Sequence, residues 1–163
     1  MSRKIAYGGI LLALNIILLL LVNIIPINTL FLMGLASLPI SIIIMEYGPK
    51  LGTIFYMASV ILSFIVMTNK SQWILYIFTF GIYGLIKYVI ENDRNFFTEY
   101  IMKIISANVL IFITYFILKN FVYIPVNLFT IIIFQMVFLI YDYVYSRFID
   151  YYNIRLRKII INK

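Results

Sequence analysis

The chain has 163 residues, of which 64% are hydrophobic and 12% charged, and its formal net charge is +7. A soluble domain is about half apolar and about a quarter charged, and a small domain leaves much of its surface in water. The composition therefore excludes a water-soluble globular domain and predicts an all-α membrane protein. The basic residues cluster at the ends of apolar runs, so the charge indicates membrane orientation rather than nucleic-acid binding.

The chain contains no Cys and no His. Their absence excludes thiol nucleophiles, disulfides, zinc sites of the Cys/His kind and imidazole acid–base chemistry. The sequence also lacks a phosphate-binding glycine loop and the HExxH and GxSxG motifs. We therefore expect no enzymatic activity, no cofactor and no metal site. The abundance of residues with AT-rich codons indicates a low-GC Gram-positive bacterium, and we expect its cell membrane to be the location.

Apolar runs of about 20 residues, the length that a spanning helix needs, are separated by charges, prolines and asparagines. The predicted spans are residues 5–25, 29–46, 51–68, 72–90, 101–118 and 126–147. Pro39 lies inside the second span and favours a kink. The first run begins with basic residues like a signal peptide, but it is longer than ~7–15 residues and no small-x-small cleavage site follows. We interpret it as a span.

An even number of spans places both termini on one side of the membrane. Eleven Lys and Arg residues fall on that side, and only Lys70 and Lys119 fall opposite. This asymmetry predicts that both termini are cytoplasmic. We predict a transmembrane domain over 1–148 and a basic amphipathic cytoplasmic tail over 149–163, which lies on anionic headgroups. Lys87 lies one turn inside its span and is expected to snorkel to the headgroups.

Three amides, Asn15, Asn108 and Gln135, fall near the middle of the first, fifth and sixth spans. Amides donate and accept hydrogen bonds, so they either join helices or hold a polar solute. An amide that faces lipid is costly, so each is expected to face inward. We favour interhelical bonding for any single amide, and convergence of all three on a cavity would favour solute binding.

Small residues form a stripe on one face of the first span, at Ala6, Gly9 and Ala13. Small side chains let helix backbones approach closely, so such a stripe favours helix–helix contact. Ser59 and Ser63 repeat the pattern in the third span. These stripes serve either contacts within the bundle or, for the first span, docking of another membrane protein.

Polar and aromatic residues also gather at the predicted outer ends of the spans. Trp73 is the only Trp, and Asn120 follows the fifth span. A Trp at the edge of a span is most often an interfacial anchor. The alternative is an aromatic lid over a planar ligand that enters from outside, with neighbouring amides at its mouth.

Two stretches carry a family resemblance: RKIAYGGILLALNIILLLL, and LASLPISIIIMEYGPKLGTIFYMASVILSFIV with its Gly-Pro-x-x-Gly turn. Together they resemble the substrate-binding S subunits of energy-coupling-factor vitamin transporters. They are also similar to small YybS-like membrane proteins of low-GC Gram-positive bacteria. The S-subunit resemblance implies six helices with both ends in the cytoplasm. It also implies that Ala6, Gly9 and Ala13 contact the coupling subunit of an energising module that contains ATPases.

The leading hypothesis is therefore a membrane protein resembling an S subunit, which binds a small, uncharged or weakly charged solute. Asn15, Asn108 and Gln135 would line or brace the cavity, with Trp73 and Asn120 near its mouth. The alternative is a non-transporting membrane scaffold or assembly protein. Membrane lipid is an expected partner under both hypotheses.

Overall fold

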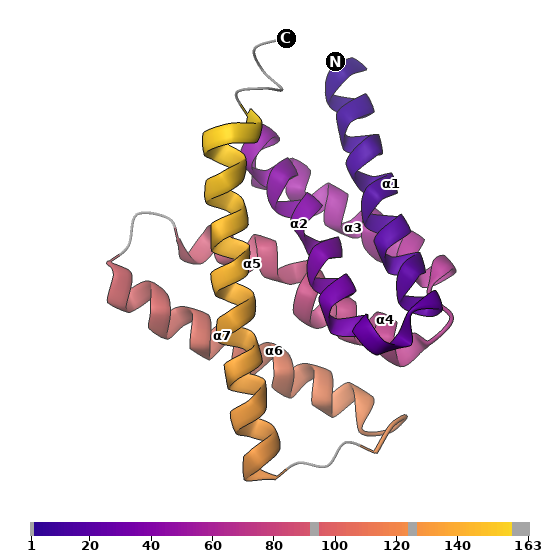
Figure 1. Ribbon diagram of the computed structural model, residues 1–163, viewed down its shortest axis with the longest axis vertical. Coiled ribbons are helices and arrows are strands. Elements are labelled where there is room, and N and C mark those ends of the chain that lie inside the picture. The colour runs from indigo at the N-terminus through magenta and orange to yellow at the C-terminus, as the bar shows by residue number, and fades with distance from the viewer. Residues whose placement is uncertain (1, 92–94, 124–126, 158–163) are drawn as a thin grey trace. The chain divides into compact units, whose positions relative to one another are not determined.

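The computed structural model describes residues 2–91, 95–123 and 127–157, and helices make up nearly all of them (Figure 1). Within these residues, six segments are long and apolar enough to cross a membrane: Lys4–Ile24, Thr29–Tyr47, Pro49–Val66, Lys70–Ile90, Phe97–Leu118 and Leu128–Arg155. The predicted all-helical class with six span-length segments is confirmed. The cytoplasmic location of the termini stays a prediction. The chain divides into two compact units, Met1–Tyr123 and Ile124–Lys163.

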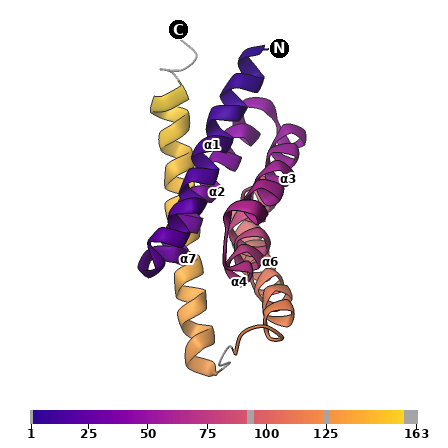
Figure 2. The ribbon, with the colours of Figure 1, turned by 90° about the vertical axis from the view of Figure 1, so that its right-hand side faces the viewer.

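The first unit is organised around its second span. Helix α1 (Ser2–Ile24) leads through a short 3-10 turn, η1 (Pro26–Asn28), into α2 (Thr29–Tyr47), and α3 (Pro49–Val66) follows directly. Helix α2 contacts α1, α3 and the part of the fourth span from Tyr76 to Ile90, and α1 and α2 lie side by side in Figures 1 and 2. In an 18-residue apolar stretch of α2, 56% of the residues are buried, compared with 22% in the corresponding stretches of α1 and α3. Pro39 lies inside α2 without ending the helix.

A tight turn joins α2 to α3. Gly48 has φ of +86°, a conformation that side chains with a Cβ rarely adopt, and Pro49 starts α3 in the first helical position. Gly52, one turn further, packs so closely on α2 that a Cβ built there would overlap Cγ1 of Ile44. The Gly-Pro-x-x-Gly pattern thus brings two antiparallel spans together directly after the turn.

The fourth span differs from the regular helix predicted over 72–90. It consists of α4 (Lys70–Leu75), a π-helical segment η2 (Tyr76–Gly81) and α5 (Ile82–Ile90). Tyr56 of α3 donates its hydroxyl to the carbonyl of Ile77 at 2.9 Å, and Thr79 donates its hydroxyl to the carbonyl of Leu75. A Cβ on Gly81 would lie 3.0 Å from the ring of Tyr56. Side chains from α3 and from the segment itself therefore support the wider helix.

Helix α6 (Phe96–Leu118) completes the first unit and contacts α4, η2 and α5. The second unit contains α7 (Leu128–Tyr151), followed by one π-helical turn, η3 (Tyr152–Leu156). Asn127 caps α7, because its side-chain oxygen accepts from the backbone N–H of Thr130 at 2.8 Å. The helix runs beyond the predicted end of the sixth span at residue 147, and the predicted tail begins inside it. Residues 158–163 of that tail lie outside the described residues.

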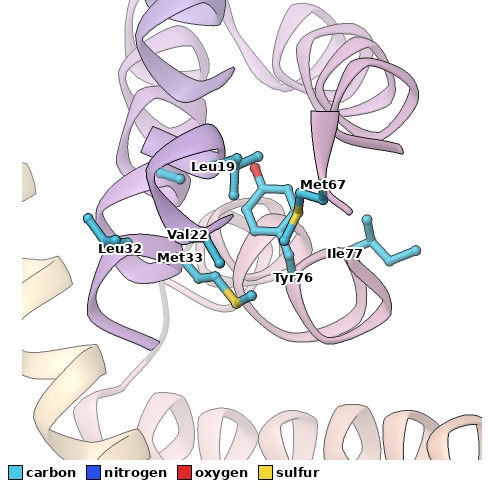
Figure 3. Close-up of a cluster of buried hydrophobic side chains, with 8 residues drawn as sticks. Leu19, Val22, Leu32, Met33, Met67, Tyr76 and Ile77 are labelled. Carbon is cyan, nitrogen blue, oxygen red and sulfur yellow. The ribbon is translucent and has the colours of Figure 1, made fainter. Parts of the chain in front are cut away.

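The buried core of the first unit lies between α1, α2 and the start of η2 (Figure 3). Leu19 and Val22 come from α1, Leu32, Met33 and Ala36 from α2, Met67 from the position directly after α3, and Tyr76 and Ile77 from η2. Ser59 and Ser63 of α3 are fully buried, in agreement with contact of the small-residue pattern within the bundle. Small residues on α2 and α3 let the two backbones approach closely. The resulting van der Waals contacts stabilise the helix pair, because the hydrophobic effect does not drive helix association in lipid.

We expect Gly52→Ala to lower the free energy of unfolding by about 1–3 kcal/mol, because the added methyl group overlaps Ile44 and forces the backbones of α2 and α3 apart. Gly9→Ala is the matched control, since a Cβ on Gly9 meets nothing within 4 Å. Unfolding of the detergent-solubilised protein by SDS measures both changes. Equal stability of the two variants would contradict the close approach at Gly52.

Candidate functional site

Asn15 is fully buried and joins three other segments of the first unit. Its amide nitrogen donates to the carbonyl of Ala36 on α2 at 2.5 Å and to the hydroxyl of Tyr76 on η2 at 2.8 Å. Its amide oxygen accepts from the hydroxyl of Ser59 on α3 at 2.7 Å. The amide of Asn15 therefore contacts α2, α3 and the fourth span.

The direction of each hydrogen bond in this cluster follows from the number of protons. The hydroxyl oxygens of Ser59 and Tyr76 are 2.9 Å apart. Ser59 has one hydroxyl proton, and it goes to Asn15, so the hydroxyl of Tyr76 must donate to Ser59. Asn15, Tyr76 and Ser59 thus form a closed ring in which each residue donates to the next, which we call the amide–hydroxyl ring. Such chains polarise one another and are strengthened cooperatively.

The amide–hydroxyl ring uses polar groups that a solute would need. Both amide protons of Asn15 and the hydroxyl protons of Ser59 and Tyr76 are taken up by protein acceptors. Among the described residues, every buried side-chain nitrogen or oxygen has a hydrogen-bond partner. The geometry therefore supports the bracing role of Asn15. Tyr76 and Ser59 were not predicted as its partners.

A second set of polar contacts closes the end of the first unit where α1 ends. The amide of Asn23 donates to the carbonyl of Val66 at 2.9 Å, and its oxygen accepts from the backbone of Thr68 at 3.2 Å. The ammonium group of Lys70 donates to the carbonyls of Phe64 at 2.5 Å and Met67 at 3.0 Å. These side chains satisfy carbonyls that the last turn of α3 leaves without intrahelical partners.

Trp73 lies at the same end and is half-buried. Its indole N–H donates to the carbonyl of Val60 at 3.2 Å, and its ring packs edge-on against Phe64 with 5.0 Å between the centroids. The only indole of the chain is therefore attached to the backbone of α3. This arrangement supports an anchoring role, whereas a lid would need a ring that is free to cover a ligand.

The amide–hydroxyl ring contains none of the other predicted solute-binding residues. Asn108 is exposed on α6, and its amide donates to the carbonyl of Ile104 in the same helix at 2.8 Å. Asn120 is exposed in the turn after α6, and Gln135 is half-buried on α7 in the second unit. Convergence of Asn15, Asn108 and Gln135 on one cavity therefore stays a prediction.

Ala6, Gly9 and Ala13 are exposed on the face of α1 opposite the amide–hydroxyl ring. Leu11, Asn15, Leu19 and Val22, which follow one another at intervals of three and four residues, form the buried face. A Cβ built on Gly9 meets nothing within 4 Å. The small-residue stripe thus leaves room for the backbone of another helix.

An ionic cluster joins the end of α5 to α6. The ammonium groups of Lys87 and Lys103 lie 2.6 and 2.5 Å from the same carboxylate oxygen of Glu91. Lys87 is only 1% exposed, so the prediction that it snorkels to the headgroups is wrong. Glu91 lies one turn after Lys87 and is close enough to neutralise it inside the protein.

No group of three or more His, Cys, Asp or Glu within residues 2–91, 95–123 and 127–157 is placed to hold a metal ion. Comparisons with protein-family models, with curated proteins and with solved structures find no match to this chain. The similarity to S subunits and to YybS-like proteins therefore stays a hypothesis based on sequence pattern.

We expect Tyr76→Phe to lower the free energy of unfolding by about 1–2 kcal/mol, because it leaves an amide proton of Asn15 and an acceptor of Ser59 without their partner. Ser59→Ala opens the same ring, so the double variant should be less destabilised than the sum of the single variants. Tyr123→Phe, which removes an exposed hydroxyl, is the control. Strictly additive losses, measured by unfolding in detergent, would show that no closed ring exists.

Proposed function

We propose that the chain is a multi-pass membrane protein that acts as a subunit of a larger membrane assembly and docks its partner through the stripe of Ala6, Gly9 and Ala13 on α1. The observation that carries this proposal is the division of α1 into two faces. One face holds Asn15 and is buried, while the small-residue face is exposed and leaves open space at Gly9.

The physical argument concerns packing in lipid. Helices in a bilayer gain little from hydrophobic burial, so close backbone contact and hydrogen bonds drive their association. The amide–hydroxyl ring fixes the rotation of α1 about its axis, because only one rotation brings Asn15 to Ala36, Ser59 and Tyr76. The small residues therefore face away from the first unit, where the helix of a partner protein can pack against them.

The resemblance to S subunits suggests the identity of this partner. In that family the small-residue stripe of the first helix contacts the coupling subunit of a transporter. By this resemblance, the partner of the present chain is an energising module with a coupling subunit and ATPases. The non-transporting alternative uses the same surface, with an assembly partner in place of the module.

Co-purification tests the docking surface. Gly9→Leu should abolish recovery of a stoichiometric membrane partner from native membranes in mild detergent, because the side chain fills the space that the partner backbone would occupy. Folding should be unchanged, since nothing in the first unit lies near that Cβ. Ile10→Leu, an isosteric change at an exposed neighbouring position, is the control.

Two outcomes would refute this proposal. One is a partner that stays bound to the Gly9→Leu variant, and the other is the absence of any stoichiometric partner in the wild type. Because the chain has no cysteine, Ala13→Cys also allows selective cross-linking. An adduct that mass spectrometry identifies as a coupling subunit would favour the transporter assignment, and a different membrane protein would favour the scaffold.

Binding of a small, uncharged solute is the second candidate function. The observation in its favour is the position of Asn108, a polar amide exposed in the middle of α6 beside the apolar residues Ile105, Val109 and Phe112. An amide both donates and accepts hydrogen bonds, so this group is suited to bind a polar solute in addition to its bond to the carbonyl of Ile104.

Thermal unfolding against a panel of vitamins and their precursors tests solute binding. At 100 times its Kd, a ligand should stabilise the protein by about 2.7 kcal/mol. Asn108→Leu should remove this stabilisation and leave the unfolding temperature of the unliganded protein unchanged. If no compound shifts the wild-type protein, solute binding is refuted, while the docking proposal stands on its own test.

A further inference from the structure

The last part of α7 and the segment η3 carry tyrosines and arginines in alternation. Tyr143, Arg147, Tyr151 and Arg155 follow one another at intervals of four residues, and all four are exposed. Residues four apart are neighbours on a helix surface. The guanidinium of Arg147 lies 5.3 Å from the ring centroid of Tyr143, and that of Arg155 lies 5.9 Å from the ring centroid of Tyr151.

The first of these pairs is held in a defined geometry. Arg147 donates from Nε to the hydroxyl of Tyr143 at 3.1 Å. Its two terminal nitrogens make no hydrogen bond within the described part of the chain. Asp150, one turn further, is exposed and adds negative charge nearby but accepts no hydrogen bond from this guanidinium. Tyr143 therefore orients Arg147. The edge of the guanidinium formed by its two terminal nitrogens stays available to bind two acceptor oxygens.

The depth of Arg147 along the helix matches the phosphate level of a bilayer. From Leu128, next to the Asn127 cap, to Arg147 the helix rises about 29 Å at 1.5 Å per residue. The hydrocarbon core of a bilayer is about 30 Å thick. If Leu128 lies at one boundary of the core, Arg147 lies at the other. Met136 and Ile140 are exposed on the same face within the core, where acyl chains would run.

We propose that Tyr143 and Arg147 form a binding site for the phosphate of an anionic phospholipid, continued by Tyr151 and Arg155. The guanidinium donates two parallel N–H bonds to the phosphate oxygens, a geometry that favours Arg over Lys. Tyr143 holds the guanidinium, and Met136 and Ile140 contact the acyl chains. Charge complementarity selects the anionic lipid, because residues 142–163 contain five basic residues and two acidic residues.

Native mass spectrometry of the full-length protein in detergent provides the test. The probes are phosphatidylglycerol and phosphatidylcholine with identical acyl chains. The wild type should retain phosphatidylglycerol preferentially, and Arg147→Gln should reduce that preference about fivefold, in line with the usual contribution of one basic residue at a membrane surface. Lys119→Gln removes the same charge from an exposed position after α6 and should leave the preference unchanged.

Two conservative variants separate a defined site from general attraction. Arg147→Lys keeps the charge but lacks paired planar donors, and Tyr143→Phe keeps the ring but loses the bond to Nε. Each should lower the preference while the circular dichroism spectrum stays that of the wild type, because both residues are exposed. Full retention in both variants would overturn the site, as would equal losses in Arg147→Gln and Lys119→Gln. Displacement of the lipid by millimolar inorganic phosphate would show a free-anion site and refute lipid recognition.

Discussion

The amide–hydroxyl ring sets the rotation of four of the six spans relative to one another. Asn15 contributes an amide from α1, Ser59 a hydroxyl from α3 and Tyr76 a hydroxyl from η2, while the carbonyl of Ala36 connects α2. Apolar packing among Leu, Ile, Met and Phe side chains tolerates small rotations and shifts of a helix. Hydrogen bonds inside an apolar bundle do not, because neither lipid nor the surrounding side chains offer substitutes.

The two faces of helix α1 thus differ in role: one packs within the first unit, and the other is exposed. The buried face joins the helix to its own bundle through Asn15 and three aliphatic side chains, Leu11, Leu19 and Val22. Asn23 adds hydrogen bonds to Val66 and Thr68 near the end of the helix. The opposite face, with Ala6, Gly9 and Ala13, contributes nothing to that bundle and is open at Gly9. The hydrogen bonds of Asn15 on the buried face therefore also fix the direction in which the candidate docking surface on the opposite face points.

The number of spans and their approximate bounds could be predicted because the length of an apolar run is fixed by the thickness of the bilayer. The inward orientation of Asn15 followed from the cost of an amide in lipid. Its partners could not be predicted, because depth in the membrane does not define the rotation of the neighbouring helices. The prediction for Lys87 was wrong for a related reason, since a lysine near a helix end either reaches the headgroups or forms an ion pair. Glu91 lies one turn after Lys87 in the sequence, but only the folded chain brings Lys103 to the same carboxylate.

The π-helical segment Tyr76–Gly81 has a consequence for comparing this chain with others. A π-turn accommodates one more residue than an α-turn, and each α-helical residue advances the helix by about 100°. A sequence aligned without a gap to a protein whose fourth span is α-helical throughout would therefore match residues on different faces after Gly81. Loss of one residue from this segment would let it close into an α-turn and leave Lys87 facing α6, whereas loss of one residue between Ile82 and Lys87 would turn Lys87 about a quarter of the way round the helix.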